Sequence, residues 1–123
     1  MAIVSIADGV VHVELRLWDK ILAVHGSLHI PLTHIESAAA GDPPPVPWFS
    51  KLIGTNAPGL MAAGIFFTSE GLAFYDYGAG RPSLVLELHH ERYARAVIEI
   101  DFPQTPEEAA GMIQAALAAV RSA

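Results

Sequence analysis

The sequence predicts a mainly β domain that ends in one C-terminal α-helix. Short runs of alternating apolar and polar residues fill roughly the first hundred positions, and a capped amphipathic segment follows them. A period of two is typical of half-buried strands, whereas apolar residues three and four positions apart are typical of a helix. Strands this short bury their apolar faces only by packing together. We therefore expect a small β-barrel of about seven strands, closed by the helix.

The terminal helix is expected at about 105–121. Thr105 suits the N-cap, Pro106 suits the first helical position, and Glu108 completes a capping box. A single apolar stripe follows, and it needs a surface on which to pack. We expect that surface to be the sheet of the same chain. The stripe consists of Ala109, Met112, Ile113, Ala116, Leu117 and Val120.

The clearest predicted strand runs from Val10 to Leu17, where every second residue is apolar. Residues 18–24 lose this alternation and lead to Gly26, so a short helical turn is expected there, with a continued strand as the alternative. Residues 89–94 are expected to form a polar turn. Further strands are expected at 28–32, 35–39, 63–68, 72–77, 83–87 and 96–101. The short gaps between the three strands from 63 to 87 indicate a meander.

One long segment, 41–61, is rich in proline and is expected to be an irregular loop. Trp48 and Phe49 follow its proline run, which is stiff enough to hold them away from the barrel. Large aromatic side chains often anchor interfaces. We expect Trp48 and Phe49 to bind protein; the alternative is that they fold back as a lid over the barrel.

Several segments carry a resemblance to a known family: Trp18–Ala23, His29–Leu32, Leu86–Tyr93, and the Ala57–Leu60 loop that runs into 63–65. In these segments and in strand order, the chain resembles bacterial pleckstrin-homology-like proteins of mostly uncharacterised function. The likeness spans nearly all of residues 1–123, which we expect to be a single domain. The resemblance implies a bent antiparallel barrel of about seven strands capped by a C-terminal helix. It also implies a binding or assembly role, and it implies no catalytic residues.

Charge argues against three classes of partner. The formal net charge is −6, and the seven basic residues are scattered along the chain. Nucleic acids and anionic membranes are bound by clustered Lys and Arg. A phosphoinositide site of the pleckstrin-homology type needs converging cations, yet Arg16 and Lys20 stand beside Glu14 and Asp19. No nucleic acid, specific phosphoinositide or membrane is therefore expected as a partner.

Histidine is the unusual titratable residue, with six copies and no cysteine in the chain. His25 and His29 are four residues apart, but Gly26 interrupts any helix that would align them. His89 and His90 are adjacent and would point apart on a strand. We therefore expect no metal and no cofactor. The number of histidines alone raises the hypothesis of a pH-sensitive interface.

The sequence also argues against catalysis and against export. Glu99 and Asp101 share one strand face and are expected to be solvated, and no serine lies in a nucleophile-elbow context. Met1 begins a strand-like run without the features of a signal peptide, and no stretch reaches the ~20 apolar residues of a spanning helix. The expected location is the cytoplasm.

The function expected from these observations is that of a non-catalytic binding or assembly module. It would mediate contact with another protein or self-association into a homo-oligomer. The alternative is a small-ligand-binding β-barrel, in which apolar strand faces enclose a cavity. Met112, Ile113 and Leu117 count against that alternative, because they would fill one mouth of so small a barrel.

Overall fold

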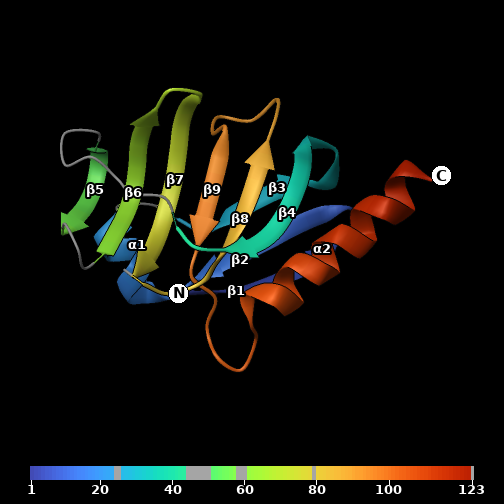
Figure 1. The fold of residues 1–123 in the computed structure, drawn as a ribbon, viewed down its shortest axis with the longest axis horizontal. Coiled ribbons are helices and arrows are strands. Elements are labelled where there is room, and N and C mark those ends of the chain that lie inside the picture. Colours follow the sequence, from blue (N-terminus) through green and yellow to red (C-terminus); the bar gives the residue numbers. More distant parts are fainter. Residues whose placement is uncertain (24–25, 44–50, 58–60, 79, 123) are drawn as a thin grey trace.

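A computed structural model describes residues 1–23, 26–43, 51–57, 61–78 and 80–122 of the chain. Within these residues the fold is mainly β, with nine strands in two sheets and a C-terminal helix (Figure 1). In chain order the elements are β1 (Ala2–Ala7), β2 (Val10–Leu15), α1 (Leu17–Ala23), β3 (Leu28–Pro31), the 3-10 turn η1 (Leu32–His34), β4 (Ile35–Gly41), β5 (Lys51–Ala57), β6 (Met61–Thr68), β7 (Gly71–Gly78), β8 (Ser83–Leu88), β9 (Arg95–Ile98) and α2 (Pro106–Arg121).

The strands form two sheets, where the sequence predicted one antiparallel barrel of about seven strands. The smaller sheet has the order β1-β2-β3, and the larger has the order β4-β8-β9-β7-β6-β5. Among the described residues the sheets do not close into a barrel; they meet at one corner, where Ala2 N donates to Glu99 O (3.0 Å) and Asp101 N donates to Ala2 O (2.8 Å).

One pair of strands departs from the expected meander. β9 lies between β7 and β8 and runs parallel to β7. The reason lies in its composition, since Ala96, Val97 and Ile98 are all fully buried. A continuous apolar run of this kind belongs in the centre of a sheet with both faces covered, whereas strands of a meander with one solvated face alternate.

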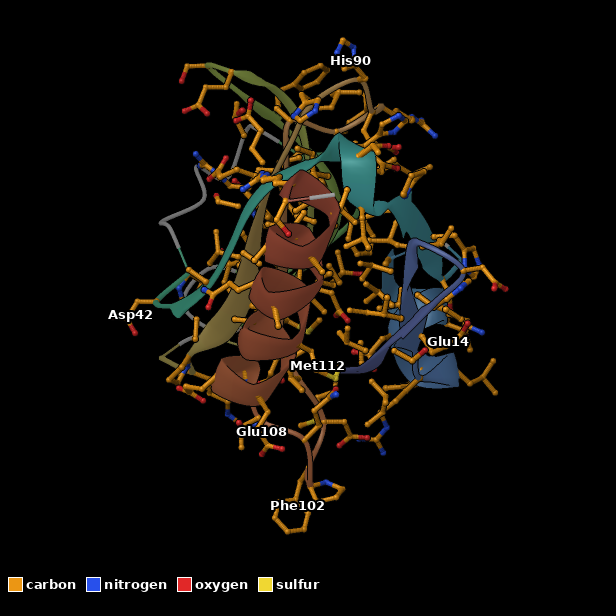
Figure 2. All side chains as sticks on the ribbon, turned by 90° about the vertical axis from the view of Figure 1, so that its right-hand side faces the viewer. Glu14, Asp42, His90, Phe102, Glu108 and Met112 are labelled. Carbon is orange, nitrogen blue, oxygen red and sulfur yellow. The ribbon has the colours of Figure 1, made fainter. Side chains whose placement is uncertain are left out.

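The main core lies between the two sheets and beneath α2. Inward side chains of both sheets pack there together with the buried side of the helix. In Figure 2, α2 lies across the side of the molecule where the two sheets are apart. Its contacts are with β4, β8, η1 and β1.

The predicted start of α2 is confirmed, and its predicted apolar stripe is confirmed in part. The Thr105 side chain accepts a hydrogen bond from Glu108 N at 3.1 Å. The buried positions are Ala109, Ala110, Ile113 and Leu117. Met112 and Val120 remain 39% and 44% exposed, because the helix meets the sheets along a narrow line and these two residues lie beside it.

The N-terminal elements follow the prediction except at one residue. Val11, Val13 and Leu15 are buried, as the alternation predicted. Leu17 is not their continuation: the strand ends at Leu15, and Leu17 begins α1 with 74% of its surface exposed. The predicted helical turn is confirmed as α1.

The segment 41–61, predicted to be one irregular loop, contains the strand β5. Alternation is absent from this strand, and a bulge lies between Lys51 and Ile53, which explains why the pattern missed it. Gly54 pairs with Gly64 of β6, and both have positive φ, 121° and 134°. A Cβ at Gly64 would lie 2.1 Å from Ile53 O. The two backbones therefore approach closely at a point where only glycine fits.

Candidate interaction surface

The two residues predicted from sequence to bind protein, Trp48 and Phe49, lie outside the described residues. Their role stays a prediction. The described part of the chain nevertheless offers a surface of the expected kind, formed by α1 and by strand β5, which follows the predicted pair in sequence. We call this the α1/β5 surface and define it by Leu17, Trp18, Ile21, Leu52 and Ile53.

Helix α1 contributes large apolar side chains that are not packed into the core. Leu17, Trp18 and Ile21 are 74%, 68% and 54% exposed. The helix is anchored through its C-terminal end, where Ala23 is fully buried in the main core. Short loops and helices of small domains normally expose polar residues. Three large apolar groups on two helical turns are thus a marker of an interaction site.

Strand β5 contributes the second half of the surface. It is an edge strand: among the described residues it pairs with β6 and with no other strand. Leu52 and Ile53 are 49% and 42% exposed. Helix α1 lies against β5 and β6, and both elements are found at the same end of the molecule in Figure 1, far from α2.

The opposite edge strand of the same sheet, β4, is covered by helix α2, unlike β5. The Gln114 side chain donates to Ala38 O (2.6 Å), and Arg121 donates to Glu36 O (2.8 Å) and Ile35 O (3.3 Å). These side chains of α2 satisfy backbone carbonyls that an edge strand leaves open. A shallow pocket of about 250 Å³ lies along this contact, lined by residues of β4 and α2.

A second apolar cluster lies on the outer face of the larger sheet, on β6, β7 and β9. Tyr75 stacks on Phe66 and meets Tyr77 edge-on, with ring centroids 5.2 Å and 5.7 Å apart. Burial raises the pKa of Tyr77 to about 12, with a smaller contribution from Tyr75. Burial also raises the pKa of Tyr75, although nearby Arg95 opposes the rise. Both phenols therefore stay neutral near pH 7 and act as packing groups there.

The histidines fall into two groups among the described residues, and His25 lies outside them. His34 Nδ1 and Glu91 Oε2 are 2.5 Å apart, which ties η1 to the 89–94 connection. His89 Nε2 lies 2.8 Å from Thr33 O, and its Nδ1 is 3.5 Å from Glu36 Oε1 without a hydrogen bond. These are contacts within the chain, so the hypothesis of a pH-sensitive interface stays a prediction.

The other histidine pair was missed by sequence reasoning. His12 on β2 and His29 on β3 face each other across the smaller sheet, with Nδ1 atoms 2.8 Å apart. They are far apart in sequence, so no local spacing brings them together. The available signal was that each lies at an outward position of its strand. Within the described ranges, no group of three or more His, Cys, Asp or Glu side chains is arranged to hold a metal ion.

The carboxylates are distributed differently from the expectation. Glu99 and Asp101, predicted to be solvated, are only 12% and 26% exposed in their side chains; Glu99 lies 3.4 Å from Arg81, and Asp101 lies 3.7 Å from Arg16. Each carboxylate therefore has a separate arginine as its partner. The reason for their burial is the corner at which β1 meets the end of β9.

Asp76 on β7 is the buried acid that the sequence did not single out. It is 2% exposed and lies 3.2 Å from the Met1 ammonium, which in turn lies 2.7 Å from Asp19. Burial raises the pKa of Asp76 to about 6; the ammonium lowers it and the Asp19 carboxylate raises it. The arrangement holds β7, α1 and the chain start together, and it faces inward from the sheet rather than into a cleft.

Comparison of the chain with models of protein families, with curated proteins and with solved structures finds no match. Among the described residues, no helix is both long and apolar enough to cross a membrane.

Proposed function

We propose that the protein is a non-catalytic assembly module that self-associates through the α1/β5 surface. The observation that carries this proposal is the exposure of Leu17, Trp18 and Ile21 beside an edge strand that exposes two further apolar side chains. Burying such groups stabilises an association by about 25 cal/mol per Å² of apolar area before the costs of binding are counted. The occupant we propose is a second copy of the same chain.

Backbone pairing between two copies of β5 supports this occupant. Most homodimers are two-fold symmetric, so an antiparallel pair would be centred on one residue of the strand. Centred on Gly54, the pair would place Lys51 opposite Ala57 and Ile53 opposite Thr55. No like charges would then lie opposite each other, and a twelve-stranded continuous sheet would form across the axis from two copies of six strands.

The distribution of charge also favours this surface. The chain carries a formal charge of −6, which opposes contact between copies in general. Strand β5 carries no acidic residue, and its one charged side chain is Lys51 at its start. On α1, Lys20 accompanies Asp19, and Asp19 is paired with the Met1 ammonium. Strand β5 thus adds no negative charge to the proposed contact, and the acidic residue of α1 is paired.

Other roles have less support. Arg16, one of the two cations available for an inositol phosphate, lies 3.7 Å from Asp101, which weakens any phosphoinositide site. The core between the sheets is packed with buried apolar side chains, which counts against the alternative of a small-ligand barrel. The pleckstrin-homology-like resemblance and a cytoplasmic location stay predictions. The order of several strands followed by one helix supports the resemblance. The parallel pairing of β7 with β9 departs from the antiparallel barrel that it implies.

The proposal is tested by light scattering of the whole chain over a concentration series, with two matched double variants. Trp18→Ser/Ile21→Ser removes apolar groups from the α1/β5 surface. Met112→Ser/Val120→Ser removes two exposed apolar groups from α2, at the other end of the molecule, and serves as the control. We expect the first variant to stay monomeric and the control to associate as the wild type does. An unchanged association in the first variant would contradict the proposal.

A further inference from the structure

The outer face of the smaller sheet carries a pair of histidines in a defined geometry. His12 and His29 are directly opposed residues of the antiparallel strands β2 and β3. Their Nδ1 atoms are 2.8 Å apart, and their rings meet edge-on with centroids 5.0 Å apart and planes at 68°. The two side chains therefore present nitrogen atoms to each other at the surface of a paired sheet.

Two imidazole nitrogens at this distance share at most one proton, because a second N–H would point at the first. One Nδ1–H therefore donates to the other Nδ1, nearly along the line that joins them. A metal ion can take the place of the shared proton, since imidazole nitrogen is a good ligand for Zn²⁺, Cu²⁺ and Ni²⁺. We propose that His12 and His29 form a two-imidazole binding site for a divalent transition metal that prefers tetragonal coordination, with Cu²⁺ the best fit.

The choice of metal follows from the nitrogen separation. With metal–nitrogen bonds of about 2.0 Å, two nitrogens 2.8 Å apart subtend about 90° at the metal. A right angle is the angle between neighbouring ligands in tetragonal Cu²⁺ and Ni²⁺ sites. Tetrahedral Zn²⁺ would need the nitrogens about 3.3 Å apart. A metal bound to both nitrogens lies beside the line that joins them, so each ring has to turn by roughly 45°, mainly about its terminal side-chain torsion, which is soft in histidine.

The surroundings hold the pair in place and leave it open to solvent. The residues flanking the histidines on the inner face, Val11, Val13 and Ile30, are buried in the core, so the two strands are fixed by packing. His29 is exposed, which provides a path for an ion. The remaining coordination positions would be taken by water, because no third protein ligand is arranged at the site among the described residues.

Glu14 supplies a negative charge on the same face of β2. Its Oε2 accepts a hydrogen bond from Ser27 Oγ at 3.0 Å, and Ser27 precedes β3. Figure 2 shows Glu14 on the smaller sheet, on the side turned away from the larger sheet. A carboxylate held two residues from His12 attracts a cation to this face without occupying its coordination sphere.

The test is a Cu²⁺ titration of the whole chain by calorimetry, with electron paramagnetic resonance of the bound ion. His12→Ala and His29→Ala remove one ligand each, and His90→Ala removes an exposed histidine elsewhere as the control. We expect each ligand variant to weaken Cu²⁺ binding by about tenfold or more, the control to change it by less than about twofold, and the wild-type spectrum to show a tetragonal ion with two nitrogen ligands.

Equal binding by wild type and both ligand variants would overturn the proposal, as would an equal loss in the His90→Ala control. Far-ultraviolet circular dichroism of each variant shows whether the fold is retained. If either alanine variant unfolds, His12→Asn and His29→Asn keep a polar side chain of similar size at the outward position and give the same test. The site does not depend on self-association, so this result and the light-scattering result stand separately.

Discussion

The buried carboxyl of Asp76 gives the sharpest prediction about stability. The side chain lies on the core side of β7 and is only 3% exposed. Burial raises its pKa from 3.8 to about 6. The Asp76→Asn substitution keeps the size and shape of the group and removes its charge. It leaves the Met1 ammonium paired with Asp19, 2.7 Å away. The variant therefore isolates the cost of holding a charge at this position.

The sign of the effect follows from the direction of the pKa shift. The folded protein binds the Asp76 proton more tightly than the unfolded chain does, so the carboxyl favours folding when protonated. This contribution is fully present below the unfolded pKa of 3.8 and is lost as the pH rises through about 6. The full difference corresponds to about 3 kcal/mol, of which about 2 kcal/mol is lost between about pH 4.5 and about pH 8.

The assay is urea unfolding of wild type and Asp76→Asn at these two pH values. We expect the free energy of unfolding of the variant minus that of wild type to be about 2 kcal/mol larger at the higher pH than at the lower, so the variant is relatively more stable at high pH. Comparing the two pH values cancels the fixed difference between an amide and a protonated carboxyl. Asp42→Asn is the control, because Asp42 is exposed, as Figure 2 shows.

Two results would refute this reasoning. A pH-independent difference between wild type and Asp76→Asn would mean that the carboxyl does not titrate in this range. A relative loss of stability in the variant at high pH would mean that the ionised carboxylate is stabilised by the ammonium more than it is destabilised by burial. The same pH dependence in Asp42→Asn would assign the effect to general charge instead.

Further predictions concern backbone fit and helix capping, each measured by urea unfolding. Gly64→Ala is expected to lower the free energy of unfolding by at least about 3 kcal/mol, because its Cβ would lie 2.1 Å from Ile53 O at a φ of 134°. Gly111 lies on the exposed side of α2, where a Cβ would have no neighbour within 4 Å. Gly111→Ala should therefore raise the free energy of unfolding by up to about 1 kcal/mol. Thr105→Ala is expected to cost about 1 kcal/mol by loss of the N-cap, with Thr105→Ser recovering most of it. Equal effects at the two glycines, or no recovery by serine, would contradict these accounts.

The C-terminal helix α2 and strand β2 could be predicted because their sequence signals are local. The capping residues Thr105 and Glu108 are three positions apart, and the alternation of Val11, Val13 and Leu15 is read directly along the chain. In both cases the residues that set the structure are neighbours in sequence. The structure confirms the cap and the buried face.

The arrangement of the sheets could not be read in the same way, because it depends on contacts between distant residues. β9 is inserted beside β7 through a pairing of Ala73 with Arg95 and Asp76 with Ile98. The bulge between Lys51 and Ile53 interrupts the pairing of β5, so no alternation marks this strand in the sequence. Parallel pairing and bulges leave no periodic pattern, so a meander was the natural expectation.

The candidate sites, too, depend on contacts between residues that are distant in sequence. His12 and His29 meet because two strands pair in one register, and a shift of one residue would send one of them into the core. Asp76 looks like one polar residue of an ordinary strand, and its burial follows from the sheet that covers it. The sequence predicts a helical turn at α1, and only the exposure of its apolar side chains in the structure identifies them as a surface.

The central claim is that copies of this chain associate through α1 and β5. The most direct measurement is the solution mass of the wild-type chain by light scattering over a concentration series, beside Trp18→Ser/Ile21→Ser. A mass that rises to that of a dimer in the wild type and stays at 13.1 kDa in the variant is the predicted result. A wild-type mass of 13.1 kDa at every concentration would contradict the claim.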